Sequence, residues 1–66
     1  MAVAKVIEVT AGSKEGLEDA INKGIGKAGD TLSNVEGAWI KDIKVRCKNG
    51  KIDEWRVNMK VSFVLK

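Results

Sequence analysis

The segment KNGKIDEWRVNMKVSFVL, residues 48–65, combines a tight turn with a long alternating strand. Asn49-Gly50 is the pair favoured in a two-residue hairpin turn, because both central residues of that turn take positive φ. After the turn, apolar and polar residues alternate, as in a strand with one buried face. The apolar set is Trp55, Val57, Met59, Val61, Phe63 and Leu65. The segment therefore predicts a turn followed by the second strand of an antiparallel hairpin.

The preceding segment, Val35 to Cys47, is predicted to be the partner strand of this hairpin. We place a β-bulge near Lys41 and Asp42, because a bulge lets apolar residues of different parity face the same core. Trp39 then lies on the opposite, polar side of the strand. The apolar residues that change parity are Ala38 and Ile40, followed by Ile43, Val45 and Cys47.

The N-terminal half predicts a strand followed by a helix. Val3 to Thr10 is rich in β-branched residues, which favours a strand. Apolar residues then recur at steps of three and four up to Ala28, which predicts an amphipathic helix. We expect Ser13 to cap this helix, which ends between Asp30 and Leu32. The chain is thus one α+β domain, residues 1–66, in the order β-α-β-β, with a three-stranded antiparallel sheet wrapped around one helix.

The sequence GIGKAG, residues 24–29, matches the G-x-G-x-x-G pattern of phosphate-binding loops. In such sites the glycines directly follow a strand and open a helix, whose free N–H groups bind the phosphate. Here the motif falls in the second half of the predicted helix, where the free groups are carbonyls. We interpret Gly24 as a small residue on the packed face and Gly26 as a solvent-side glycine. The motif does not indicate a nucleotide site.

Composition excludes several functional classes. With one cysteine and no histidine, the chain cannot form an intrachain disulfide, a zinc-type ligand set or a histidine-dependent catalytic constellation. The net charge is +3, but the lysines and arginines are interleaved with acidic residues along the chain. This distribution indicates a solvated surface and not a nucleic-acid interface. No apolar run reaches the ~20 residues of a membrane span, and no signal peptide is recognisable. We expect a cytoplasmic protein that is not an enzyme.

The difference in length between the predicted helix and the last predicted strand indicates association between copies of the chain. A helix of about 17 residues spans about 26 Å, whereas a strand from Ile52 to Leu65 spans about 46 Å. One helix cannot cover that strand, so its uncovered apolar end is expected to contact another subunit. Trp39 has two interpretations: a subunit contact, or a stacking platform for a small planar ligand. Trp55, on the apolar side, is expected in the core or at an interface edge.

Three segments give the whole chain from Val3 to Lys66 a resemblance to the dodecins: KVIEVTAGS (5–13), DTLSNV (30–35) and WRVNMKVSFVL (55–65). The resemblance implies a hollow homododecamer with helices outward and sheets inward. It also implies storage of a flavin, riboflavin or FMN, stacked between tryptophans of neighbouring subunits. The alternative is a dodecin-like structural cage, with calcium or magnesium held by carboxylates and carbonyls at subunit contacts.

Two ligand positions depart from the family pattern. Alignment places the family's flavin-stacking tryptophan at Gly37 and its glutamine at Arg56. Trp39 follows two residues later on the same strand face, about 7 Å away. Arg56 donates hydrogen bonds but cannot accept them. Lys44, where relatives can carry a basic residue, is expected to meet a flavin or nucleotide phosphate. The candidate flavin-binding residues are therefore Gly37, Trp39, Lys44 and Arg56.

Overall fold

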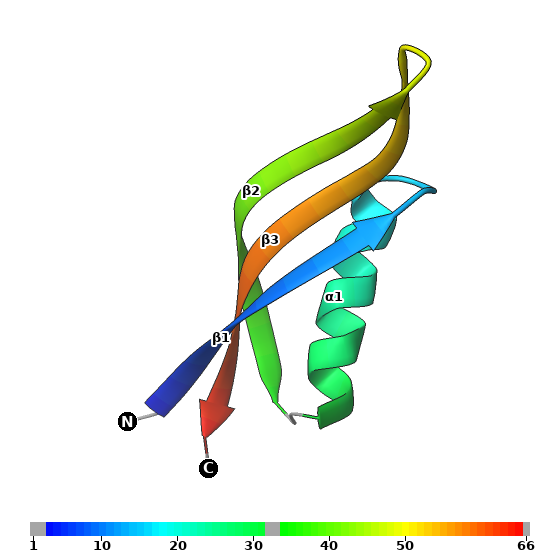
Figure 1. The fold of residues 1–66 in the computed structure, drawn as a ribbon. Helices are drawn as coiled ribbons and strands as arrows, with labels where there is room; N and C mark the ends of the chain where they lie inside the picture. Colours follow the sequence, from blue (N-terminus) through cyan, green and yellow to red (C-terminus); the bar gives the residue numbers. More distant parts are fainter. Residues whose placement is uncertain (1–2, 32–33, 66) are drawn as a thin grey trace.

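The computed structural model, which describes residues 3–31 and 34–65, has the predicted element order. A sheet is formed by β1 (Val3–Ser13), β2 (Val35–Lys48) and β3 (Lys51–Leu65), with β3 in the centre and both pairings antiparallel. The single helix, α1 (Leu17–Thr31), lies along one side of this sheet (Figure 1). The β-α-β-β prediction is confirmed.

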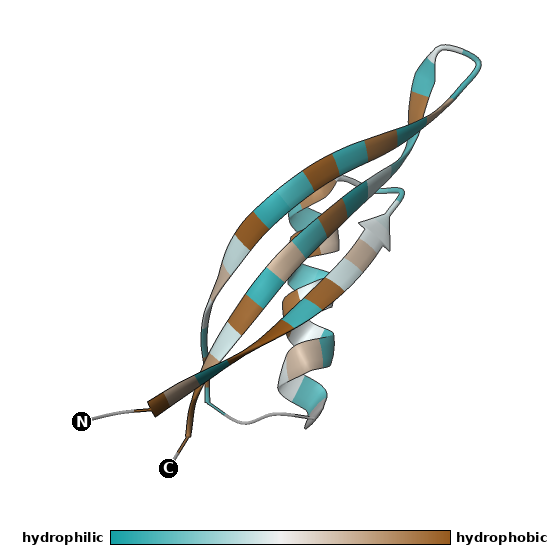
Figure 2. Ribbon diagram, turned by 60° about the vertical axis from the view of Figure 1, so that its left-hand side comes forward, coloured by the Kyte–Doolittle hydropathy of each residue, from teal (hydrophilic) through white to brown (hydrophobic). Residues whose placement is uncertain are grey.

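The core lies between α1 and the central strand. Val57, Met59 and Val61 of β3 are completely or almost completely buried, and they pack with Ala20 and Ala28 of the helix. Apolar and polar residues alternate along the strands (Figure 2), so one side of the sheet faces the helix and the other does not. We call these two sides the helix face and the open face.

The predicted bulge is confirmed by a shift in the β2–β3 register between Ile40 and Asp42. The shift keeps Ile40 and Ile43 on the helix face, where they pair with Met59 and Val57. A further shift, between Arg46 and Cys47, was not predicted from the sequence. It pairs Cys47 with Ile52. The Cys47 side chain is exposed near the hairpin turn, so the expectation that it belongs to the core is wrong.

The hairpin turn has the predicted geometry. Asn49 has a φ of 53° and Gly50 a φ of 75°, as the two central positions of a type I′ turn require. This turn joins β2 to β3 directly and fixes them as antiparallel neighbours.

The helix begins later than predicted. Its first residue is Leu17, and the Gly16 carbonyl accepts the first helical hydrogen bond, from the Ala20 N–H at 3.1 Å. Ser13 is instead the last residue of β1, where it pairs with Trp55. The cross-strand pairing extends β1 by three residues beyond the predicted end at Thr10. The helix ends at Thr31; Leu32, the limit of the predicted range, lies outside the described residues.

The glycine motif lies within α1, as predicted. Gly24 is buried, whereas Gly26 is exposed on the outer side. Neither lies at the start of the helix, where free N–H groups would meet a phosphate. In the described part of the chain, no helix is long and apolar enough to span a membrane.

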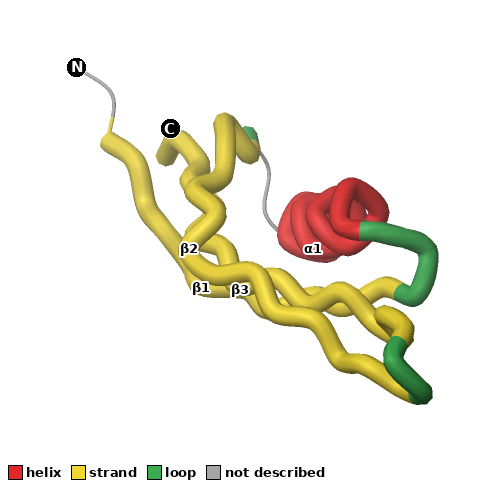
Figure 3. The backbone as a smooth tube through the Cα atoms, turned by 90° about the horizontal axis from the view of Figure 1, so that it is seen from above, coloured by secondary structure: helices red, strands yellow, loops and turns green. Residues whose placement is uncertain are grey.

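The sheet is longer than the helix that covers it. The 15 residues of α1 span about 22 Å, whereas the 15 residues of β3 span about 50 Å. The β2–β3 hairpin extends past the start of the helix (Figure 1), and the sheet curves around the helix (Figure 3). Apolar side chains are exposed towards both ends of the sheet: Val3, Ile43, Val45, Ile52 and Leu65.

Candidate ligand-binding site

All four predicted site residues lie on the open face. The register places Gly37 opposite Ser62, Trp39 opposite Lys60 and Lys44 opposite Arg56. Each partner on β3 has the opposite parity to the buried Val57, Met59 and Val61. Within one chain, however, the predicted residues do not form one site: Trp39 lines one hollow, and Lys44 and Arg56 line another.

The larger hollow, here called the aromatic hollow, has a volume of about 440 Å³. Trp39 is 66% exposed, and the Lys60 ammonium lies 5.7 Å from the centroid of its ring. That position over an indole face is a cation–π contact. The hollow crosses all three strands and offers one flat aromatic surface beside one positive charge. Its lining residues are Val6, Ala38, Trp39, Lys60 and Ser62.

Gly37 lies next to this hollow on β2 but contributes no side chain. The Ser62 hydroxyl donates a hydrogen bond to the Gly37 carbonyl at 3.3 Å. A Cβ atom on Gly37 would meet only the Ser62 Oγ, at 3.9 Å, an ordinary van der Waals distance. The position therefore leaves room for a larger side chain or for a ligand.

The smaller hollow, here called the polar hollow, has a volume of about 80 Å³ and is lined by Thr10, Asp42, Lys44, Arg56 and Asn58. A hydrogen-bond chain crosses the three strands in it. The Thr10 hydroxyl donates to the Asn58 Oδ1 at 2.6 Å, and the Asn58 Nδ2 donates to Asp42 at 3.1 Å. This chain fixes the Asn58 amide in the polar hollow, which the cationic side chains of Lys44 and Arg56 also line.

The Arg56 guanidinium is held from one side by Glu54. Its Nε lies 3.3 Å from the Glu54 carboxylate, and Arg46 lies 3.8 Å from the same oxygen. Gly12 makes room for this carboxylate, because a Cβ atom there would lie 2.8 Å from the Glu54 Oε2. This ion pair is made through Nε and does not involve the terminal amino groups of Arg56.

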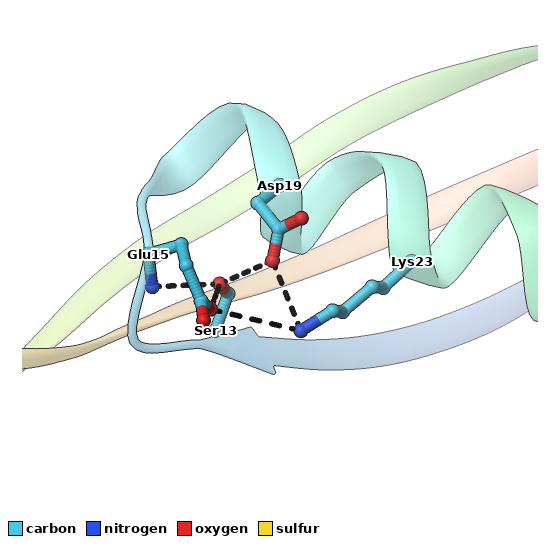
Figure 4. Close-up of polar contacts among 4 residues, drawn as sticks. All are labelled: Ser13, Glu15, Asp19 and Lys23. Carbon is cyan, nitrogen blue, oxygen red and sulfur yellow. Dashed lines mark hydrogen bonds and ion pairs between the residues drawn. The ribbon is translucent and has the colours of Figure 1, made fainter.

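A second polar cluster lies at the start of α1 (Figure 4). The Ser13 hydroxyl accepts from the Glu15 N–H at 3.0 Å and donates to the Asp19 carboxylate at 2.5 Å. Lys23 lies 3.0 Å from Asp19 and 3.8 Å from Glu15. The Ser13 hydrogen bond, followed by that of Lys23, holds the pKa of Asp19 below its ordinary value. Asp19 in turn raises the pKa of Lys23.

The open face can bind a ligand by stacking, by hydrogen bonding and by charge. Residues 3–31 and 34–65 contain no group of three metal-ligating side chains. Sequence reasoning missed Val6, Lys60 and Ser62 around Trp39. Lys60 could have been found only from the cross-strand register that pairs it with Trp39. That register depends on the number of bulges between this pair and the hairpin turn.

A family model described as Dodecin matches residues 3–66. The chain belongs to the dodecin family. A search of curated proteins gave no match.

Solved dodecin structures share its fold. The dodecin from Streptomyces davaonensis is 32% identical, with a TM-score of 0.90 over 98% of this chain and 96% of that one. A point mutant of the Thermus thermophilus dodecin is 30% identical, with a TM-score of 0.93 over 100% of this chain and 98% of that one. The calcium dodecin from Mycobacterium tuberculosis, a calcium-chelating antigen, is 26% identical, with a TM-score of 0.81 over 97% of this chain and 91% of that one.

Proposed function

We propose that this dodecin binds a flavin, riboflavin or FMN, and stores it without turnover in a cytoplasmic homododecamer. The observation that carries the proposal is the position of Trp39: an indole 66% exposed on the open face, at the edge of a hollow of about 440 Å³. A tryptophan with that exposure leaves a large apolar area in water unless a ligand or a subunit covers it. An isoalloxazine ring has the flat shape that such a surface stacks against.

The polar hollow gives the rest of the ligand a place to bind. Lys60 and Arg56 are four residues apart on β3, which puts the two hollows about 13 Å apart along the same strand. A ring stacked on Trp39 would direct its ribityl chain along the strand towards Asn58. A terminal phosphate would then meet the positive charges of Lys44 and Arg56.

The proposed homododecamer accounts for the apolar residues that one chain leaves exposed. On the helix face, Val3 and Leu65 mark one end of the sheet, and Ile43 and Val45 lie on β2 towards the hairpin turn. Burial of these side chains against other copies would stabilise the assembly by about 25 cal/mol for each Å² of apolar surface covered. Association is the expected source of stability in a chain of this size without disulfides. The number twelve rests on membership of the dodecin family.

A fluorescence titration tests the binding proposal. Riboflavin or FMN fluorescence should be quenched when the assembled protein is added, because stacking on an indole quenches an isoalloxazine. Trp39→Ala should weaken binding by about 1–3 kcal/mol, the range for a base stacked on an aromatic side chain. Trp55→Phe changes the other tryptophan, on the helix face, and should leave quenching intact. Flavin fluorescence that is unaffected by excess assembled protein would overturn the proposal.

The second candidate is an ion-binding cage, and the similarity to the calcium dodecin from Mycobacterium tuberculosis favours it. In this chain the carboxylates of Glu15 and Asp19 already pair with Lys23. Since residues 3–31 and 34–65 of one chain contain no group of three metal-ligating side chains, a calcium site would combine carboxylates from neighbouring subunits. Calorimetric titration with calcium separates the candidates: stoichiometric calcium binding by a protein that fails to quench flavin would select the cage.

A further inference from the structure

The Lys60 ammonium is placed over Trp39 by the sheet itself. The register makes the two residues direct cross-strand partners on the open face, and the ammonium lies 5.7 Å from the ring centroid. On β1, the other neighbour of β3 in the sheet, Glu8 is the cross-strand partner of Lys60. The Glu8 carboxylate forms a salt bridge with Lys41, with 3.6 Å between the charged atoms. Among the described residues Lys60 forms no salt bridge of its own, so its charge remains available in the aromatic hollow.

The hollow contains a flat aromatic surface and a positive charge but no carboxylate. Its other lining residues are Val6, Ala38 and Ser62, which are apolar or neutral. A neutral planar ligand that stacks on the indole face covered by the ammonium displaces that ammonium, and the cation–π contact is lost. A planar ligand with a negatively charged edge keeps the ammonium paired while it stacks.

We propose that the aromatic hollow selects planar aromatic ligands that carry a negative charge at the ring edge, with Trp39 as the stacking surface and Lys60 as the charge partner. This inference deepens the proposed function, on which it rests for the use of this hollow as the ring site. It assigns the selection to Lys60, a residue outside the four predicted from the sequence.

Two probes with the same ring test the selection: lumiflavin, and a lumiflavin in which a carboxylate replaces one ring methyl group. Their fluorescence is titrated with the assembled protein at low ionic strength. The carboxylate should bind about three- to fivefold more tightly than lumiflavin, the range expected for one partly exposed charge pair. Lys60→Gln should abolish that preference, so that the carboxylate probe binds no more tightly than lumiflavin does. Added salt should reduce the preference of the wild-type protein.

Lys27→Gln is the matched control, because it removes the same charge from an exposed position on α1, across the sheet from the hollow. This variant should keep the preference. Equal binding of the two probes by the wild type would overturn the charge selection but leave flavin binding standing. A preference that persists in Lys60→Gln would overturn the role of Lys60. Binding of the carboxylate probe without binding of riboflavin or FMN would support the selection and reject flavin storage, whereas binding of neither probe would reject both proposals.

Discussion

Gly24 of α1 packs directly against Met59 of β3: a Cβ atom on Gly24 would lie 2.7 Å from the methyl carbon of Met59. It would also lie 3.2 Å from the Cβ of Ala11. The glycine therefore lets the helix approach the sheet closely. This packing role accounts for the first glycine of the G-x-G-x-x-G match without any phosphate.

The two helix glycines should respond differently to alanine. Gly26→Ala places a methyl group in open space and should stabilise the fold by about 1 kcal/mol, through helix propensity alone. Gly24→Ala gains the same propensity but forces the fully buried Met59 to move, at a cost of about 1–3 kcal/mol. Urea denaturation at one fixed protein concentration should rank Gly26→Ala above the wild type and Gly24→Ala below Gly26→Ala. Equal stability of the two variants would contradict the close packing.

Most of the fold was predictable because its signals are local. The Asn49-Gly50 pair fixes the turn, the alternation in β3 fixes its buried face, and a change of parity locates the bulge at Lys41 and Asp42. The start of α1 was not predictable from Ser13, because the pairing of Ser13 with Trp55 across the sheet extends β1. Long-range pairing prevailed there over a local capping preference.

The candidate site was predictable only in part. Parity alone placed Trp39 on the open face, and the register confirms it. The contact between Trp39 and Lys60 depends on every register shift between these residues and the turn. A register that differed by one residue would pair Trp39 with a residue other than Lys60. Trp39 lines one hollow, and Lys44 and Arg56 line another. This separation depends on side-chain positions, which cannot be predicted from the alternation of residues along the strands.

The cluster at the start of α1 should make stability depend on pH in the acid range. Because the folded pKa of Asp19 is lowered, its contribution to stability is present above the ordinary value of 3.8 and is lost as pH falls through the folded value. Asp19→Asn should therefore be less stable than the wild type at neutral pH, and the difference should shrink in acid. Glu18→Gln, a charge change on the same turn, should show a smaller effect at neutral pH. Thermal denaturation across this pH range measures both variants, and an Asp19→Asn difference that does not change with pH would refute the linkage.

Gly37 provides a test of ligand position by gain of binding. A Cβ atom at this position would meet only the Ser62 Oγ, at 3.9 Å, so the open face has room for a side chain there. Gly37→Trp should add an indole at the position of the family's flavin tryptophan and strengthen flavin binding by up to about 1–3 kcal/mol. Gly37→Leu is the control for bulk without a stacking surface and should give a smaller gain or none. The measurement is the dissociation constant from flavin quenching, and weaker binding by Gly37→Trp than by Gly37→Leu would place the ring elsewhere.

Sedimentation velocity followed in the flavin absorption band tests the central claim most directly, because it reports the assembly and its ligand together. With FMN or riboflavin added to the wild-type protein, flavin absorbance should sediment in one boundary with a mass near twelve times 7.2 kDa. With Trp39→Ala the protein boundary should keep that mass, while a larger share of the flavin stays in the slow, free fraction. A wild-type protein that sediments as a monomer or dimer, or a twelve-chain boundary without flavin absorbance, would contradict the account.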